Sequence, residues 1–104
     1  MAQFDVYRNP GLETRESIPY LLDVQNALLD ALATRIVVPL VRRSVMPRPA
    51  EHLNPAFNIE GEPVVMSTAE LAGISRHALG ERVGSLAEHR SEIVSAIDFL
   101  VTGI

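Results

Sequence analysis

Short runs of apolar residues, broken by turn residues, fill the first eighty positions of the chain, as is typical of β-strands. Residues 3–8 alternate, with Phe4 and Val6 on one face, and Asn9-Pro10-Gly11 then ends the run. Residues 20–25 form a second mixed run of the same length. The first quarter of the chain therefore predicts two short strands joined by a polar loop.

The strongest strand pattern covers residues 35–41. Its centre, Ile36-Val37-Val38, is apolar and β-branched throughout, as expected of a strand covered on both faces. Pro39 has no N–H for a ladder, so we expect it at an edge, a bulge or a strand end. The proline-rich segment 46–55 then predicts a covering loop rather than a linker between domains.

Two further runs, 56–59 and 63–67, flank Glu60-Gly61-Glu62 and predict a hairpin. Residues 74–78 predict a further short strand, and residues 26–34 predict a helical turn or a simple connection.

The clearest helical pattern lies at the C-terminal end, over about residues 86–101. Ser85 and Glu88 have the spacing of a capping box, which predicts the start of this helix. Several short strands followed by one helix predict a single domain over residues 1–104, a small antiparallel barrel with a packed terminal helix. The apolar residues of the helix recur on one face: Leu86, Ile93, Ile97, Leu100 and Ile104.

Composition narrows the functional classes. The chain has 104 residues, 47% of them apolar and 21% charged, with a net charge of −4 and no cysteine. An acidic chain is poorly suited to a phosphate backbone, so we expect no direct nucleic-acid binding by the chain alone. There is no secretory signal pattern at the start and no apolar stretch of the ~20 residues that span a bilayer, so we expect a cytoplasmic protein without a membrane partner.

Candidate catalytic chemistry is sparse. His52, His77 and His89 do not have metal-ligand spacing, and residues 80–84 lack the lysine and hydroxyl of a phosphate-binding loop. We therefore expect no metal, no cofactor and no enzymatic activity. One enzymatic alternative stays open, in which a small barrel cleaves RNA with an acid or base and a cation. The parts available for it are Asp23, Arg35 and His77.

The order and spacing of several motifs resemble the CcdB family over nearly the whole chain. These motifs are Gln3-Phe4-Asp5-Val6-Tyr7, Asp23-Val24-Gln25, Ile36-Val37-Val38-Pro39-Leu40 and the terminal Gly103-Ile104. The resemblance implies a mainly β fold, an SH3-like antiparallel barrel of the CcdB and MazF kind with a C-terminal helix. It also implies a homodimeric toxin of a type II toxin–antitoxin system. Such toxins are not enzymes: they bind the DNA gyrase A subunit, trap the gyrase–DNA cleavage complex, and are neutralised by a CcdA-like antitoxin.

The resemblance also implies a gyrase-binding site. Gly103 and Ile104 match the family's terminal Trp-Gly-Ile, Thr102 stands in place of the tryptophan, and Asp98 in place of an asparagine. Leu28 and Leu29 fall where the family has two isoleucines of the same surface. The implied gyrase-binding residues are Leu28, Leu29, Asp98, Thr102, Gly103 and Ile104.

Thr102 is the main departure from the family pattern. The resemblance implies that the family's tryptophans, one from each protomer, form an aromatic clamp on an arginine of gyrase. An arginine on an aromatic face gains ~0.5–2 kcal/mol, and threonine offers no such face. A first alternative is therefore a diverged binding protein that keeps its antitoxin but no longer poisons gyrase; the endoribonuclease is a second. For the tail, a purely structural role is also open, in which Val101 and Ile104 finish the apolar stripe and Gly103 ends the helix. Leu28 and Leu29 could equally pack under the barrel.

Overall fold

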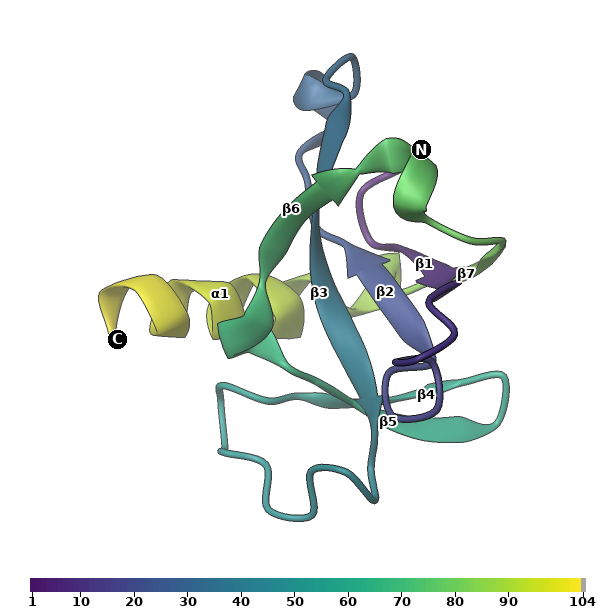
Figure 1. Ribbon diagram of the computed structural model, residues 1–104. Helices are drawn as coiled ribbons and strands as arrows, with labels where there is room; N and C mark the ends of the chain where they lie inside the picture. The colour runs from purple at the N-terminus through teal and green to yellow at the C-terminus, as the bar shows by residue number, and fades with distance from the viewer. Residues whose placement is uncertain (104) are drawn as a thin grey trace.

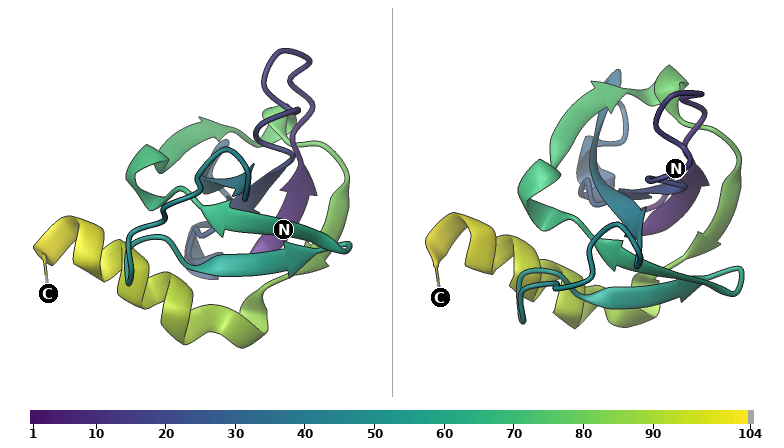
Figure 2. Two further views of the ribbon diagram at one scale, coloured as in Figure 1. Left: turned by 90° about the horizontal axis from the view of Figure 1, so that it is seen from below. Right: turned by 60° about the horizontal axis from the view of Figure 1, so that its bottom comes forward.

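In a computed structural model that describes residues 1–103, one antiparallel sheet curls into a half-open barrel with a helix beneath it (Figure 1; Figure 2). The mainly β fold with a C-terminal helix is thus confirmed. Four single-turn 3-10 helices lie in the connections between elements: η1 (Ala27–Leu29), η2 (Thr68–Glu70), η3 (Arg76–Ala78) and η4 (Ala87–His89). The strands and the helix are β1 (Asp5–Arg8), β2 (Tyr20–Asp23), β3 (Thr34–Arg42), β4 (Ala56–Ile59), β5 (Glu62–Met66), β6 (Ala72–Ser75), β7 (Arg82–Ser85) and α1 (Arg90–Thr102).

The long strand β3 is the centre of the sheet. One of its edges pairs with β2, while the other pairs first with β6, as far as Val37, and then with β5, from Leu40 onward. Pro39 lies between these two partners, inside the strand. Its carbonyl accepts the N–H of Ser67 at 2.9 Å. The expectation of an edge, bulge or strand end was therefore wrong. Proline is tolerated here because β6 stops pairing at Val37 and β5 starts at Leu40, so no ladder bond needs an N–H from Pro39.

The β4–β5 hairpin is confirmed. Its turn residues Glu60 and Gly61 have φ angles of 53° and 81°, the left-handed pair that matches the twist of the flanking strands. The segment between β2 and β3 contains η1, so the predicted helical turn is also confirmed.

The C-terminal third departs from the predicted boundaries. The strand expected at residues 74–78 lies earlier in the chain, as β6 (Ala72–Ser75). Residues 76–78 form the single turn η3 instead. The pattern also missed β7, which contains an arginine and a glycine and pairs with β1. The expected capping box does not form, because Ser85 ends β7 and its Oγ accepts the N–H of Ala87 at 3.1 Å. The helix consequently starts at Arg90 rather than near residue 86.

The helix α1 closes the open side of the barrel with only its first half. Ile93 and Ala96 are fully buried against the core, whereas Phe99, Leu100 and Val101 are exposed. The end of α1 extends beyond the sheet in both views of Figure 2. Within residues 1–103, no helix is long and apolar enough to cross a membrane. The buried core comprises Phe4, Val6, Tyr20, Leu22, Val38, Leu40, Phe57, Ile59, Val64, Met66, Leu86, Ile93 and Ala96.

The predicted apolar stripe of α1 is thus confirmed at its start and wrong at its end. Leu86 and Ile93 are buried and Ile97 packs partly against the core, but Leu100 is exposed. Val101 is 76% exposed, so it does not finish a core stripe. Ile104 lies outside the described residues.

We expect the two halves of α1 to differ sharply in their contribution to stability. Ile93→Ala removes a fully buried side chain and should lower the free energy of unfolding by about 2–5 kcal/mol. Val101→Ala, on the same helix, should change it by less than about 0.5 kcal/mol. Urea denaturation followed by circular dichroism measures both values. Equal losses in the two variants would contradict the assignment of the anchoring half.

Candidate functional site

The connection between β2 and β3, residues 26–33, presents leucines to solvent; we call it the leucine loop. Leu28 is 90% exposed and Leu29 is 50% exposed, and Leu32 lies beside them on the surface. Asn26 starts the turn, since its Oδ1 accepts the N–H of Leu28 at 2.8 Å. No residue of η1 is buried. Packing of Leu28 under the barrel is therefore excluded, and the loop is a surface feature.

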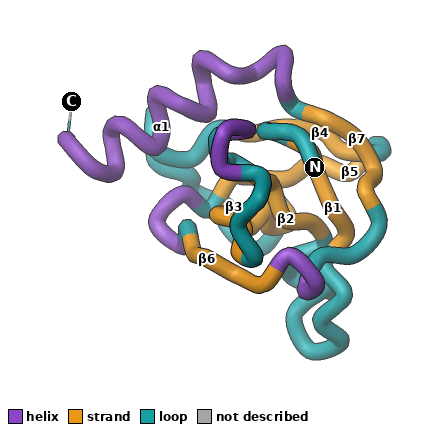
Figure 3. Tube along the Cα trace, turned by 90° about the horizontal axis from the view of Figure 1, so that it is seen from above, coloured by secondary structure: helices purple, strands orange, loops and turns teal. Residues whose placement is uncertain are grey.

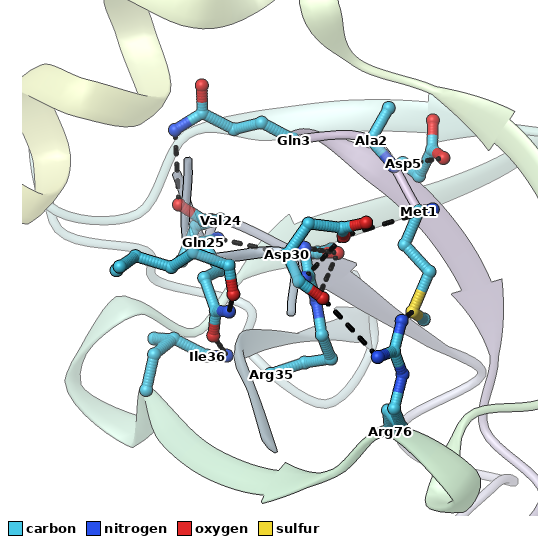
Figure 4. A network of polar contacts seen from close by, with 12 residues as sticks. Met1, Ala2, Gln3, Asp5, Val24, Gln25, Asp30, Arg35, Ile36 and Arg76 are labelled. Carbon is cyan, nitrogen blue, oxygen red and sulfur yellow. Dashed lines mark hydrogen bonds and ion pairs between the residues drawn. The ribbon is translucent and has the colours of Figure 1, made fainter. Parts of the chain in front are cut away.

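A buried ion pair lies directly behind the leucine loop (Figure 4). The guanidinium of Arg35, fully buried on β3, bonds to Asp23 Oδ2 at 2.6 Å and to Asp30 Oδ1 at 2.8 Å. Asp23 belongs to β2 and Asp30 to the loop, so one side chain joins strand, strand and loop. Burial raises the pKa of the nearby Tyr7 phenol; the carboxylates of Asp5 and Asp23 raise it further, and Arg35 acts against them.

Gln25 connects the same network to the backbone on both sides. Its Nε2 donates to the carbonyl of Leu29 at 2.8 Å, and its Oε1 accepts the N–H of Ile36 at 3.0 Å. Its own N–H donates to Asp23 Oδ1 at 2.9 Å. Every buried side-chain nitrogen and oxygen of the described residues has a hydrogen-bond partner, so the network is fully satisfied.

The structure brings together two of the three residues of the ribonuclease alternative. Asp23 and Arg35 form the buried pair, but both side chains are sealed from solvent and cannot touch RNA as they stand. His77 lies on η3 at the surface. The other two histidines lie elsewhere, His52 in the 46–55 loop and His89 beside Glu92 at 3.1 Å. The described residues contain no group of three or more His, Cys, Asp or Glu that could hold a metal ion.

The second candidate surface is the exposed end of α1. Thr102 Oγ1 donates to the carbonyl of Asp98 at 2.7 Å, one turn earlier, so its hydroxyl proton is engaged within the helix. Gly103 ends the helix with φ 75° and donates its N–H to Phe99 at 2.9 Å. Asp98 and Thr102 are exposed, whereas the expected contact Ile104 lies outside the described residues.

Within residues 1–103, the leucine loop and the end of α1 lie at different places on the surface of the molecule. The loop stands at one end of the barrel and the end of α1 projects to the side (Figure 1; Figure 3). Among residues 1–103, no hydrogen bond or ion pair joins Leu28 or Leu29 to Asp98, Thr102 or Gly103. The expected gyrase-binding residues therefore form two separate exposed groups in one chain.

Sequence reasoning missed the polar support of the leucine loop. Asp30, Gln25 and Arg76 all bond to the loop or to Arg35, yet none was predicted to have a role. One signal was present: polar residues at Asp23 and Gln25 interrupt an apolar strand, and polar residues buried at alternate positions share one face. The spacing of these residues along the sequence did not reveal which groups they would bind.

Comparison with known proteins assigns the family. The model of the CcdB protein family matches residues 3–103. The chain belongs to the CcdB family. The expectation drawn from the sequence motifs is thereby confirmed.

Solved structures share the fold of this CcdB-family chain at low sequence identity. An endoribonuclease from a mycobacterial species, in complex with its cognate antitoxin, has a TM-score of 0.76 and 16% identity, covering 97% of this chain and 94% of that one. Another mycobacterial endoribonuclease has a TM-score of 0.73 and 16% identity, with 97% and 90% covered. The Mycobacterium tuberculosis toxin MazF-mt6 has a TM-score of 0.66 and 18% identity, with 79% and 84% covered.

These neighbours correct one expectation. The lack of a linear catalytic motif and the CcdB resemblance predicted a protein that is not an enzyme, but two similar structures are named endoribonucleases. Proteins named endoribonucleases thus share this fold, and one fold can carry different functions. The fold is therefore no argument against enzymatic activity.

The expectation that the chain is a toxin of a toxin–antitoxin system is supported. A CcdB-family match, together with a neighbour solved in complex with its antitoxin, supports a toxin of a toxin–antitoxin system.

We expect the fold to be strongly destabilised when one partner of the buried ion pair is removed. Asp23→Asn leaves the buried guanidinium of Arg35 short of one charged partner, which should cost about 3–5 kcal/mol of unfolding free energy. The control Glu81→Gln breaks a surface pair with Arg8 of 3.7 Å and should cost less than about 1 kcal/mol. Chemical denaturation of both variants measures the difference. A similar small loss in both would show that the pair contributes little.

Proposed function

We propose that this CcdB-family chain is a toxin that binds the DNA gyrase A subunit and traps the gyrase–DNA cleavage complex. The observation that carries the proposal is the pair of exposed apolar features, the leucine loop and the end of α1. A leucine that is 90% exposed buries little apolar surface within its own chain, and such residues mark protein-binding surfaces when they cluster. The family match over residues 3–103 supports gyrase as the target.

The chemistry at the end of α1 determines how this contact works without a tryptophan. The hydroxyl proton of Thr102 is engaged with Asp98, so the side chain offers mainly its methyl group. The exposed carboxylate of Asp98, one turn earlier on the same face, is suited to an arginine of the partner. We propose that Asp98 replaces part of the attraction that an aromatic ring would supply. Gly103 and Ile104 complete the proposed contact.

A homodimer is part of the proposal. Phe99 and Leu100, which are 36% and 39% exposed, form an apolar part of α1 that a second copy would cover, while Asp98 and Thr102 remain exposed for gyrase A. Dimerisation would also present two leucine loops and two helix ends on one particle, so that the separate groups of one chain could act on a single partner.

A CcdA-like antitoxin is the proposed neutralising partner, and the cytoplasm, where gyrase acts on DNA, is the proposed site of action. The neighbour solved with its cognate antitoxin supports the first part.

A gyrase cleavage assay tests the target. We expect the purified protein to accumulate linear DNA with dose, and Leu28→Asp to weaken this at least about tenfold, because a carboxylate disrupts an apolar contact. Leu12→Asp is the matched control: Leu12 is 75% exposed on the loop between β1 and β2, and its replacement should leave poisoning unchanged. Wild-type protein without effect at high dose would refute gyrase poisoning.

The same assay distinguishes the diverged alternative. If the wild-type protein is inactive but Thr102→Trp poisons gyrase, the chain has kept the surface and lost the aromatic clamp. Antitoxin binding by the wild-type protein would then identify it as a diverged binding module.

A second candidate function is RNA cleavage, which the similar structures named endoribonucleases favour. Asp23 and Arg35 are sealed in the core, so this activity would need other residues. Incubation of the protein with total RNA, followed by gel electrophoresis, tests it. Discrete fragments that disappear on addition of the antitoxin would support cleavage, and intact RNA would refute it.

A further inference from the structure

One side chain reaches the leucine loop from a distant part of the chain. Arg76 follows β6 directly, and its guanidinium lies beside Asp30 in Figure 4. Its Nη1 donates to the carbonyl of Asp30 at 3.3 Å and to that of Leu32 at 3.4 Å. Its backbone N–H donates to the carbonyl of Ala33 at 3.0 Å. Arg76 thus holds three backbone carbonyls in the second half of the loop.

The leucine loop has little apolar packing to keep its shape. Its three leucines are exposed and no residue of η1 is buried. The order of the loop therefore depends on polar contacts from two sides. Arg35 and Gln25 hold it from the interior of the barrel, and Arg76 holds it from the neighbouring surface.

We infer that Arg76 is a positioning residue, which fixes the direction of Leu28 and Leu29 without itself belonging to the contact surface. A guanidinium suits this task because it stays charged and presents five N–H donors in a planar fork, so that one side chain can span two carbonyls. The effect on the loop stands by itself; only the expected effect on binding rests on the proposed gyrase function.

Arg76 can be changed without breaking the core. Arg35 is fully buried, and its loss would leave Asp23 without its cation. Arg76 is half-buried on the surface, and its partners are backbone carbonyls that water can reach once the side chain is removed. A variant at this position should therefore fold and loosen only the loop.

Amide hydrogen exchange measured by NMR tests the inference. The N–H groups of Leu29, Asp30 and Leu32 bond within the loop. In Arg76→Ala, these amides should exchange at least about fivefold faster, while the core amide of Val38 keeps its wild-type rate. Arg76→Lys keeps a cation that can reach one carbonyl, and it should restore part of the protection.

A matched control separates loop positioning from general destabilisation. Arg43 donates from Nη1 to the carbonyl of Met46 at 2.8 Å, in the loop after β3. Arg43→Ala should leave exchange in the leucine loop at its wild-type rate. Wild-type exchange in Arg76→Ala, or equal acceleration in both variants, would overturn the inference.

Binding provides the second readout. If the wild-type protein binds the gyrase A subunit, Arg76→Ala should weaken it about tenfold, and combining it with Leu28→Asp should add less than the sum of the two losses. A loosened loop with unchanged affinity would overturn the positioning role. If the wild-type protein does not bind gyrase A, the proposed function fails, and the exchange rates alone still decide whether Arg76 orders the loop.

Discussion

The buried guanidinium of Arg35 is the constraint on which the rest of the structure depends. It lies in the interior of a small barrel, where an uncompensated charge would be prohibitive, and it is tolerated because Asp23 and Asp30 both face it. Apolar side chains of similar volume would serve stability at least as well. What the ion pair adds is direction: it ties the loop between β2 and β3 to two strands at once. The exposed leucines are therefore positioned by the Arg35–Asp30 ion pair, although their own side chains are not part of it.

The two proposed contact surfaces are built on different principles. The leucine loop is short, lacks a core of its own and is held by hydrogen bonds from its flanks. The end of α1 is rigid because the first half of the helix is anchored by Ile93 and Ala96, and its exposed turns continue that helix into solvent. A partner that engages both would meet one surface ordered by polar contacts and one ordered by helical continuity.

Much of the fold could be predicted because the relevant signals are local. The β-branched run around Val37, the turn at Gly61 and the periodicity around Ile93 each reflect a single element. The position of Pro39 was predicted wrongly because a proline fits inside β3 only where β5 and β6 share one edge of that strand. This arrangement is a property of the whole sheet and not of the local sequence. The capping box predicted at Ser85 does not form for a related reason. Ser85 is the last residue of β7 and pairs with Asp5 of β1, which is far away in the sequence. The candidate site was predicted only at its exposed residues. Arg76 lies 46 residues from Asp30, whose carbonyl it binds, and the spacing of Asp23, Asp30 and Arg35 does not reveal that they form one ion-pair network.

The pairing of β1 with β7 has a kinetic consequence. Three of the six ladders join consecutive strands, β1 with β2, β2 with β3 and β4 with β5, whereas the β1–β7 ladder pairs residues 5–7 with residues 82–85. Closing so large a loop is entropically slow, so we expect the hairpins to form early and the barrel to close last. Leu86 donates its N–H to Phe4 immediately beyond that ladder, which makes docking of α1 part of the same late step. During synthesis β1 could pair early with β2, but its second edge would stay unpaired until residues 82–85 had emerged.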